Sequence, residues 1–198
     1  LVKYEGESDS MIFCKSKRAA RRVKESITRF IEGTLYLKVN KEKTVVSYVR
    51  GVKYLGYSFY VMKGKYRLTV HPKSKAKMKL SLKELTNRSN GWGYVKRKQK
   101  LKDYIRGWIG YYHLADMKRF LLDTDEWLRR RIRMCIWKAW KKPKTKVGNL
   151  IKCGIEKYKA CEWGNTRKGY WRIADSPILK VAINNDSLRK AAQNWRIF

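Results

Sequence analysis

Acidic side chains are scarce in this 198-residue chain, which has 16 Asp and Glu against 49 Lys and Arg and a formal net charge of +33. Self-repulsion of that size opposes a compact monomer and is tolerated when a polyanion is the partner. Yet 43% of the residues are hydrophobic and 13% are aromatic, a composition that a disordered basic tail lacks. The composition therefore predicts a folded protein, and it favours nucleic acid over a membrane surface as the partner.

Long apolar runs and paired cysteines are also missing. No run approaches the roughly 18–20 residues of a membrane span, and the chain shows no signal-peptide pattern. The four cysteines are scattered without a Cys-x-x-Cys pair, and the two histidines cannot complete a zinc site. We therefore expect reduced thiols. Because Leu1–Tyr4 already has the character of a strand and no initiator Met precedes it, we also expect a processed or incomplete chain.

Residues 1–70 combine strand signals with one helix. Met11–Cys14 is an apolar run of strand length. Ser16 can cap a helix that runs to about Glu32, and Gly33 would end that helix in a left-handed conformation. Further strands are expected at Leu35–Val39, Thr44–Val49, Tyr54–Met62 and Tyr66–Val70, the last two joined by the turn signal Lys63-Gly64-Lys65.

Helix-forming residues dominate from Pro72 onward. Lys73–Leu85, Tyr94–Tyr112 and Met117–Trp140 each carry an apolar stripe at helical spacing, and Thr124 marks a possible break in the third. Three such helices joined by short loops predict a bundle. Shorter amphipathic segments follow at Val147–Ile151, Ile155–Trp163 and Ser187–Trp195. The predicted fold class is α+β, with a small antiparallel sheet and one helix followed by a mostly α-helical part.

Basic residues of the helical part are the strongest functional signal. They fall largely off the apolar stripe, and the stretch from Lys138 to Lys146 contains no acid. A solvated band of this kind neutralises phosphates with little regard to sequence; the alternative is an ordinary charged helix face. The band consists of Arg129, Arg130, Arg131, Arg133, Lys138, Lys141 and Lys142, and we add Lys144 and Lys146 as RNA-binding candidates.

Aromatic residues leave two interpretations open. Large aromatics at helical spacing usually form the core, but exposed ones stack on unpaired bases. Trp92 lies on a glycine-rich loop and lacks an evident core role. Basic and aromatic residues interleave in one further stretch, which predicts base stacking beside phosphate contacts. The candidates there are Arg167, Lys168, Tyr170, Trp171 and Arg172.

Signals for catalysis are weak. The chain has no defensible Ser/His/Asp set, no phosphate-binding Gly-x-x-x-x-Gly-Lys loop and no His-rich cluster. Glu5, Glu7 and Asp9 lie close together beside an apolar run. Carboxylates on adjacent turns can hold Mg²⁺ for phosphoryl transfer, although a lone cluster of this kind is usually solvated.

An ordered series of motifs resembles the second half of a group II intron reverse transcriptase, and it extends over nearly the whole chain. The matching segments are Tyr4 with Asp9–Phe13, Arg18–Ser26, Leu37–Thr44, Tyr54–Phe59, Gly107–Tyr112, Asp125–Lys138 and Thr166–Ala174. The resemblance implies that residues 1–70 are the C-terminal part of a polymerase palm and that 71–142 are a three-helix thumb, the maturase domain or domain X. Residues 143–198 would then be a helical, basic C-terminal extension.

The resemblance further implies that the protein binds group II intron RNA, assists splicing, and copies RNA into DNA with Mg²⁺ and deoxynucleotides. Target DNA, the N-terminal fingers/palm half and a second copy of the chain are further candidate partners, and no membrane is expected. The implied location is the cytoplasm, in a ribonucleoprotein or at the nucleoid. No paired-cysteine or His-Asn-His region follows, so the endonuclease module of some relatives is missing.

Two departures bear on whether the chain is an enzyme. The fingers and the earlier palm strand, which supplies one catalytic aspartate, are not in this sequence. The family's Tyr-x-Asp-Asp turn should lie within Tyr4–Ser10, where Asp9 matches the last aspartate, Ser8 replaces its neighbour and Glu7 is a possible substitute metal ligand. Lys43 falls where the family has a lysine suspected of proton transfer. The chain is therefore either part of a reverse transcriptase or a catalytically inactive RNA-binding maturase remnant; the order of motifs disfavours a ribosomal-type RNA binder.

Overall fold

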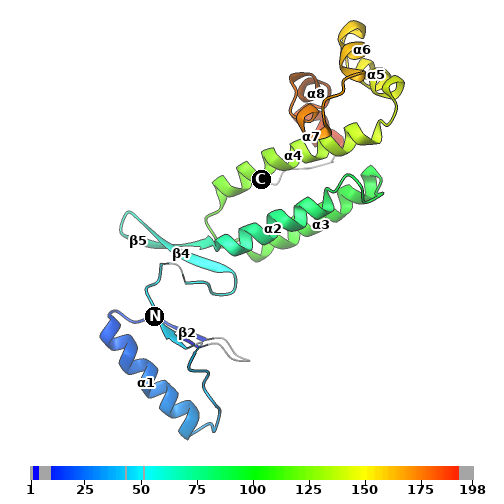
Figure 1. The fold of residues 1–198 in the computed structure, drawn as a ribbon. Coiled ribbons are helices and arrows are strands. Elements are labelled where there is room, and N and C mark those ends of the chain that lie inside the picture. Colours follow the sequence, from blue (N-terminus) through cyan, green and yellow to red (C-terminus); the bar gives the residue numbers. More distant parts are fainter. Residues whose placement is uncertain (1, 5–9, 43, 51, 192–198) are drawn as a thin grey trace. The chain divides into compact units, whose positions relative to one another are not determined.

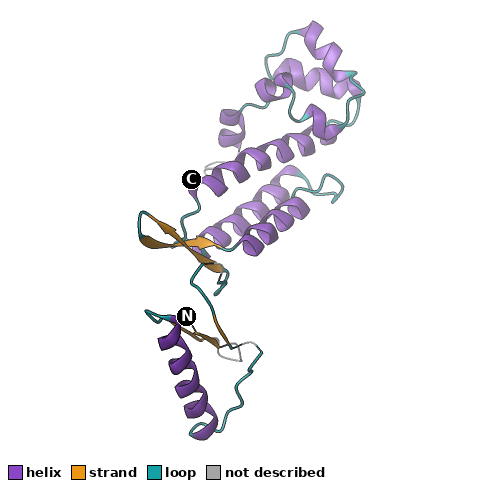
Figure 2. Cartoon of the chain, turned by 60° about the vertical axis from the view of Figure 1, so that its left-hand side comes forward, coloured by secondary structure: helices purple, strands orange, loops and turns teal. Residues whose placement is uncertain are grey.

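The computed structural model describes residues 2–4, 10–42, 44–50 and 52–191, and the chain divides into two compact units. The first unit comprises Leu1–Ser74 together with Leu114–Asp116, and the second comprises Lys75–His113 and Met117–Phe198. Small antiparallel sheets are confined to the first unit, whereas the described part of the second is helical (Figures 1 and 2). This mixture agrees with an α+β fold that is mostly helical. We call the two parts the sheet unit and the helical unit.

The sheet unit begins with three short strands and a helix. Strands β1 (Val2–Tyr4), β2 (Ser10–Ile12) and β3 (Val45–Val46) form an antiparallel sheet in the order β2-β1-β3. Helix α1 (Lys17–Gly33) starts as expected at Ser16, whose hydroxyl oxygen accepts a hydrogen bond from the Ala19 amide at 3.1 Å. Its apolar face forms the core of this part with the buried residues Ala20 and Val39 and the partly buried Ile12, Cys14, Ile27, Ile31 and Val46.

Two expectations for the segment after α1 are wrong. Gly33 is the last helical residue and does not adopt the left-handed conformation, which falls instead on Tyr36 with φ 54°. Leu35–Val39 forms no strand: the Leu37 amide donates to the Ile31 carbonyl, and the chain folds back on the helix until Val39 is buried. Strand propensity needs a partner strand to be realised, and none pairs with this segment in the described structure.

A β-hairpin completes the sheet unit. Strands β4 (Tyr57–Met62) and β5 (Lys65–Val70) pair in antiparallel register from Tyr57↔Val70 to Met62↔Lys65. Lys63 and Gly64 form the two-residue turn with φ values of 51° and 73°, the double positive φ of a type I′ turn. The expected hairpin is therefore confirmed, although its first strand begins at Tyr57 and not at Tyr54.

The connection between α3 and α4 is anchored on this hairpin. The backbone amide of Asp116 donates to the Leu68 carbonyl at 2.8 Å, and the Thr69 hydroxyl donates to the Asp116 carbonyl at 3.2 Å. The Tyr60 hydroxyl donates to the Asp116 carboxylate, and this bond is the main reason that the pKa of Tyr60 is raised. Residues 114–116 thus belong to the sheet unit although the helices on either side do not.

Three long helices form the frame of the helical unit, as expected. They are α2 (Pro72–Leu85), α3 (Tyr94–Tyr111) and α4 (Lys118–Ala139), which lie side by side in Figures 1 and 2. No break occurs at Thr124: α4 runs through this residue without interruption, and the Thr124 hydroxyl donates to the Phe120 carbonyl within the helix. The core residues follow the predicted apolar stripes: Met78, Leu82, Leu101, Ile105, Leu121, Leu128 and Ile132.

Five short helices follow α4 in the part of the chain that is described, which ends at residue 191. They are α5 (Pro143–Lys152), α6 (Lys157–Gly164), α7 (Tyr170–Ile173), α8 (Pro177–Ala182) and α9 (Asn185–Ala191). Helices α5 and α6 approach closely at Gly164, where an added Cβ atom would lie 2.4 Å from the Val147 Cγ2 atom. Helix α7 packs on α4 through Tyr170, which contacts the cluster of Met134, Cys135 and Ala174. Within the described residues, no helix is both long and apolar enough to cross a membrane.

Candidate nucleic-acid interface

The arginines of α4 are not the solvated band that the sequence predicts. Arg130 lies 4.0 Å from the ring centroid of Trp171, and its guanidinium donates to the Trp171 carbonyl through Nη2 at 3.0 Å. Its Nη1 atom is also 3.3 Å from an oxygen of Asp175. Arg129 forms an ion pair with Asp125 one turn earlier in the same helix. Both guanidinium groups are therefore already engaged by other residues of this chain.

Arg133 departs furthest from the expectation, because only 6% of its surface is exposed. Its Nε atom donates to the Ile183 carbonyl and its Nη2 atom donates to the Asn185 amide oxygen, both at 2.9 Å. Burial lowers the pKa of Arg133, although a guanidinium stays protonated at neutral pH. The side chain joins α4 to the start of α9, some fifty residues further along the chain, and its position is structural.

Arg131 ties α4 to the end of α2. Its Nε atom donates to the Thr86 hydroxyl, and its Nη2 atom donates to the Lys83 carbonyl at 2.9 Å and the Thr86 carbonyl at 3.2 Å. These carbonyls lie at the C-terminal end of a helix, where backbone acceptors lack partners and a cation is favoured. The buried thiol of Cys135 also donates to the Thr86 carbonyl at 3.2 Å, and burial raises its pKa. All four cysteines are free, as expected.

Because the chain has few acidic residues, many of its Lys and Arg side chains lie over aromatic rings and not beside carboxylates. A cation over the face of a ring is attracted by about 0.5–2 kcal/mol, and the helical unit uses this contact repeatedly. The pairs are Lys75 and Lys79 on Phe120, Arg88 on Tyr170, Lys96 on Trp92, Arg131 on Trp127, Lys146 on Trp137 and Lys168 on Trp163. Much of the unit's positive charge is thereby held in fixed positions on its surface.

Exposed lysines gather where α4 passes into α5. Lys141, Lys142 and Lys144 are exposed, and none of them forms an ion pair with a described acidic residue. Lys138 donates to the Ser89 hydroxyl at 3.1 Å, and the ammonium of Lys146 lies 4.9 Å from the Trp137 ring centroid. The three exposed residues form what we call the lysine turn. Their ammonium groups are available to an anionic ligand.

The basic and aromatic stretch around α7 is only partly exposed. Arg167, Lys168 and Arg172 are exposed, with Lys168 placed 4.7 Å from the Trp163 ring centroid. Trp171 is 39% exposed, but one face of its ring is covered by Arg130. Tyr170 is half-buried between α7 and α4. The structure therefore assigns Tyr170 to packing and leaves only part of Trp171 free for a ligand.

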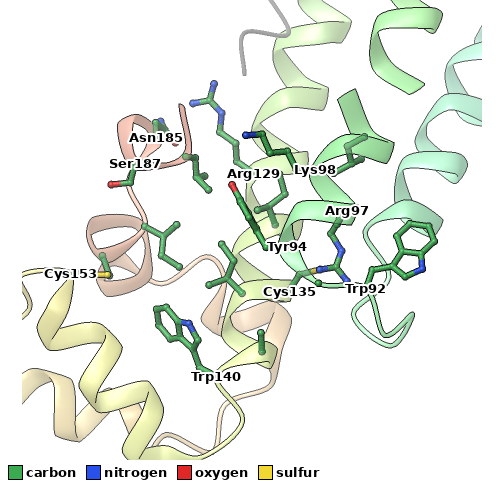
Figure 3. A pocket seen from close by; sticks show the side chains of 18 of the residues that line it. Trp92, Tyr94, Arg97, Lys98, Arg129, Cys135, Trp140, Cys153, Asn185 and Ser187 are labelled. Atoms are coloured by element: carbon green, nitrogen blue, oxygen red, sulfur yellow. The ribbon is translucent and has the colours of Figure 1, made fainter. Parts of the chain in front are cut away.

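A cavity of about 440 Å³ lies beside these helices, between the N-terminal part of α3, the C-terminal half of α4 and α8–α9 (Figure 3). Its walls are mainly apolar, with Leu101, Ile132 and Ala182 among them. Aromatic and basic side chains complete the lining. They are Trp92, Tyr94, Arg97, Lys98, Arg129 and Trp140, of which Lys98 and Arg129 lie together in Figure 3.

The catalytic and metal-binding predictions lie outside the described residues. This applies to Glu7 and Asp9 as metal ligands and to Lys43 as a proton donor. Among the residues that the structure does describe, no group of three or more His, Cys, Asp or Glu side chains could hold a metal ion. For the segment around Glu7 and Asp9, the structure describes only the strands before and after it, in which Tyr4 pairs with Ser10.

Comparison with known families decides the identity of the helical frame. Residues 75–154 match the family model for the group II intron, maturase-specific domain. Residues 75–154 are a group II intron maturase domain. No curated protein matches the chain. The match implies a group II intron maturase function in splicing for this part of the chain.

The maturase domain includes α4, the lysine turn and α5, and so it contains most of the residues predicted to bind RNA. Helices α6 to α9 lie beyond the matched range, yet α7 packs on α4 and Arg133 hydrogen-bonds to the segment that opens α9. The segment after residue 154 is therefore part of the folded helical unit. It completes one side of the maturase domain and contributes to the lining of its cavity.

Two features of the maturase domain were missed from the sequence. Lys75, Lys79 and Lys83 recur at helical spacing along α2, and the first two lie 5.4 and 5.7 Å from the Phe120 ring centroid. Their i, i+4 spacing without an acid before Glu84 is a signal that was available. Arg97, which lines the cavity, has no such signal, because its surroundings are assembled from several helices.

Proposed function

We propose that the chain binds structured group II intron RNA through the lysine turn of its maturase domain and thereby assists splicing. The observation that carries this proposal is the exposure of Lys141, Lys142 and Lys144, which pair with no described acid and lie inside the matched family range. Contacts of lysine with phosphate oxygens supply most of the sequence-independent affinity for nucleic acid. Such contacts suit a protein that must hold a folded RNA over an extended surface.

The α7 region extends this surface on chemical grounds. Arg167, Lys168 and Arg172 are exposed and basic, and the free part of Trp171 can stack on an unpaired base. Double-stranded RNA is recognised mostly through backbone and shape, whereas loops and bulges expose bases for stacking on aromatic side chains. A surface with exposed lysines and a few partly exposed aromatics suits a structured RNA with both kinds of element.

The proposal is tested by neutralising the lysine turn. In the Lys141→Ser/Lys142→Ser/Lys144→Ser variant, we expect weaker binding to a transcribed group II intron RNA. The dependence of log K on log salt should flatten by about two units, because each lost phosphate contact removes roughly 0.7–0.9. The measurement is a filter-binding titration at several salt concentrations. Exposed residues tolerate such changes within about 0.5 kcal/mol, so folding should be unaffected.

A matched control removes the same charge elsewhere. Lys41, Lys53 and Lys65 are exposed residues of the sheet unit, and their replacement by Ser should leave the salt dependence nearly unchanged. Equal losses in the two triple variants would show that binding follows net charge and not the lysine turn, and would overturn the proposal. Arg130 and Arg133 are unsuitable for this test, because both are held in contacts within the protein.

A second candidate function is RNA-templated DNA synthesis by a polymerase that the missing fingers/palm half would complete. It is favoured by the antiparallel pairing of β1 and β2, with Tyr4 opposite Ser10, because these strands lie directly before and after the segment that resembles the polymerase motif. Asp9 and Glu7 would hold Mg²⁺ there. Because the resemblance assigns one catalytic aspartate to an earlier palm strand, we expect residues 1–198 alone to extend no primer on an RNA template. Extension by the isolated chain would contradict this, and restored synthesis with a fingers/palm half would favour the polymerase over an inactive remnant.

A further inference from the structure

The cavity beside α3 and α4 has the chemistry of a binding site for a flat, polar aromatic ring. We propose that it takes up one unpaired nucleobase of the RNA, an inference that rests on the proposed RNA-binding function. Its volume of about 440 Å³ falls within the 300–1,000 Å³ typical of small-ligand sites. Proteins that read single-stranded RNA splay bases out of the stack and bind them against aromatic and apolar side chains.

The cavity walls combine apolar side chains with aromatic rings, and the flat face of a nucleobase packs against both. Ile132 and Leu101 supply buried apolar surface from α4 and α3. Trp92, Tyr94 and Trp140 supply rings from three different places in the chain, and Figure 3 shows Tyr94 and Trp140 in the same cavity. Partial burial raises the pKa of Tyr94, and its neutral hydroxyl can both donate and accept a hydrogen bond. Stacking on such rings tolerates any base, since every base has a π face.

Arg97 brings a fixed cation to the lining of this cavity. Its Nη2 atom donates to the Asn90 amide oxygen at 2.8 Å and to the Asn87 carbonyl at 3.3 Å, which fixes the guanidinium. Its Nε atom is buried and has no hydrogen-bond acceptor among the described residues. Buried N–H groups are almost always satisfied, and an unmet one costs about 1–3 kcal/mol. Because the same burial keeps the Nε atom out of a ligand's reach, Arg97 contributes to the cavity through the charge of its fixed guanidinium.

Charge at the cavity favours a ligand attached to phosphates. Lys98 and Arg129 lie together in the lining, and Asp125, the partner of Arg129, supplies a single carboxylate there. An uncharged apolar peptide would gain nothing from the nearby cations. A nucleotide suits both features of the lining, because its base has a π face for the aromatic and apolar walls and its phosphates carry negative charge.

The test compares two RNAs that differ by one base. The probes are a hairpin with a single bulged nucleotide and the same hairpin with an abasic ribose at that position, so that both carry equal charge. A base held in the cavity should make the full chain prefer the base-bearing hairpin by roughly five- to a hundredfold, the range expected for one stacked base. The two RNAs should show the same salt dependence, since their phosphate contacts are the same.

A variant that blocks the cavity should abolish this preference without weakening binding in general. Ala139 is exposed at the last turn of α4 and lines the cavity, so Ala139→Phe adds a ring at its edge without disturbing the core. Ala76→Phe is the matched control, because Ala76 is exposed on α2 and is not part of the lining. We expect Ala139→Phe to bind both hairpins equally and Ala76→Phe to retain the preference of the unmodified chain.

The outcomes separate this inference from the proposed function. Equal binding of the two hairpins by the unmodified chain would overturn the base site while leaving RNA binding intact. Loss of the preference in both Phe variants would also overturn it, because the base would then not occupy this cavity. Failure to bind either hairpin, together with no effect of neutralising the lysine turn on intron RNA, would instead contradict the proposed function itself.

Discussion

Replacing Arg133 tests whether the arginines of α4 serve the fold or the RNA. The sequence places Arg133 in a solvated, RNA-binding band, whereas the structure buries it with two acceptors from the segment around α9. The informative change is Arg133→Met, because methionine keeps the length and apolar stem of the side chain but cannot donate. We expect this variant to lose stability and to keep its intrinsic affinity for RNA.

The expected loss follows from the two hydrogen bonds. A hydrogen bond to a charged group contributes about 1.5–3 kcal/mol, and a buried acceptor left unpaired costs about 1–3 kcal/mol. Ile183 is buried and its carbonyl would stay unpaired, whereas Asn185 is exposed and its amide oxygen would regain water. Removing the desolvated charge offsets part of the loss. The net destabilisation should be about 2 kcal/mol, or roughly 4–8 °C for a chain of this size.

The assay uses the distribution of tryptophan in the chain. All eight tryptophans lie at or after residue 92, so tryptophan fluorescence during urea unfolding reports on the helical unit. The midpoint should fall for Arg133→Met, while the dissociation constant for RNA measured well below that midpoint should change less than twofold. Lys142→Met is the contrasting variant. Its free energy of unfolding should stay within about 0.5 kcal/mol of that of the unmodified chain, and the slope of log K against log salt for RNA binding should flatten by roughly one unit.

The opposite pattern would refute the reasoning. If Arg133→Met unfolds like the unmodified chain and binds RNA more weakly with a flatter salt dependence, Arg133 contacts phosphate and the described burial does not persist in solution. An Arg133→Lys variant provides a further check. Lysine keeps the charge but lacks the planar fork that reaches two acceptors, so it should recover only part of the lost stability.

Two further predictions concern the hairpin turn and the acid stability of the helical unit. Gly64→Ala should destabilise the β4–β5 hairpin by about 1 kcal/mol, because Gly64 has φ 73°, a conformation that an L side chain rarely adopts even though the added methyl meets only open space; hydrogen exchange of the hairpin amides measures the loss. Gly33→Ala, also in open space but without a positive φ, should stabilise α1, and hydrogen exchange of the α1 amides measures the gain. The hydrogen bond from Lys180, with the nearby Arg130 charge, lowers the pKa of Asp175, so its contribution is present at neutral pH and is lost as the pH falls below about 4. Asp175→Asn should therefore flatten the acid side of a plot of urea midpoint against pH. An unchanged plot would show that the Asp175 carboxyl group has the same pKa in the folded and the unfolded chain.

The local structure of this protein follows closely from its sequence where one segment contains all the information. The apolar stripes of α2, α3 and α4, the Ser16 cap and the Lys63-Gly64 turn were each predictable, because helix periodicity, capping and turn geometry depend on neighbours a few residues away. Leu35–Val39 was not, because a strand needs a partner and this segment packs on α1 instead.

The candidate RNA-binding site was likewise predictable from the sequence only in part. Composition and charge alone favour an anionic polymer as the partner, and the sequence order of basic residues already placed the lysine turn among the RNA-binding candidates. Only the tertiary structure decided which cations are free, because Arg130 and Arg133 meet Trp171, Ile183 and Asn185, residues 41 to 52 positions away. Helical spacing shows that a side chain avoids the core of its own bundle. It cannot show that a later segment folds back and covers that side chain, which is how Arg130 and Arg133 come to be held in contacts within the protein.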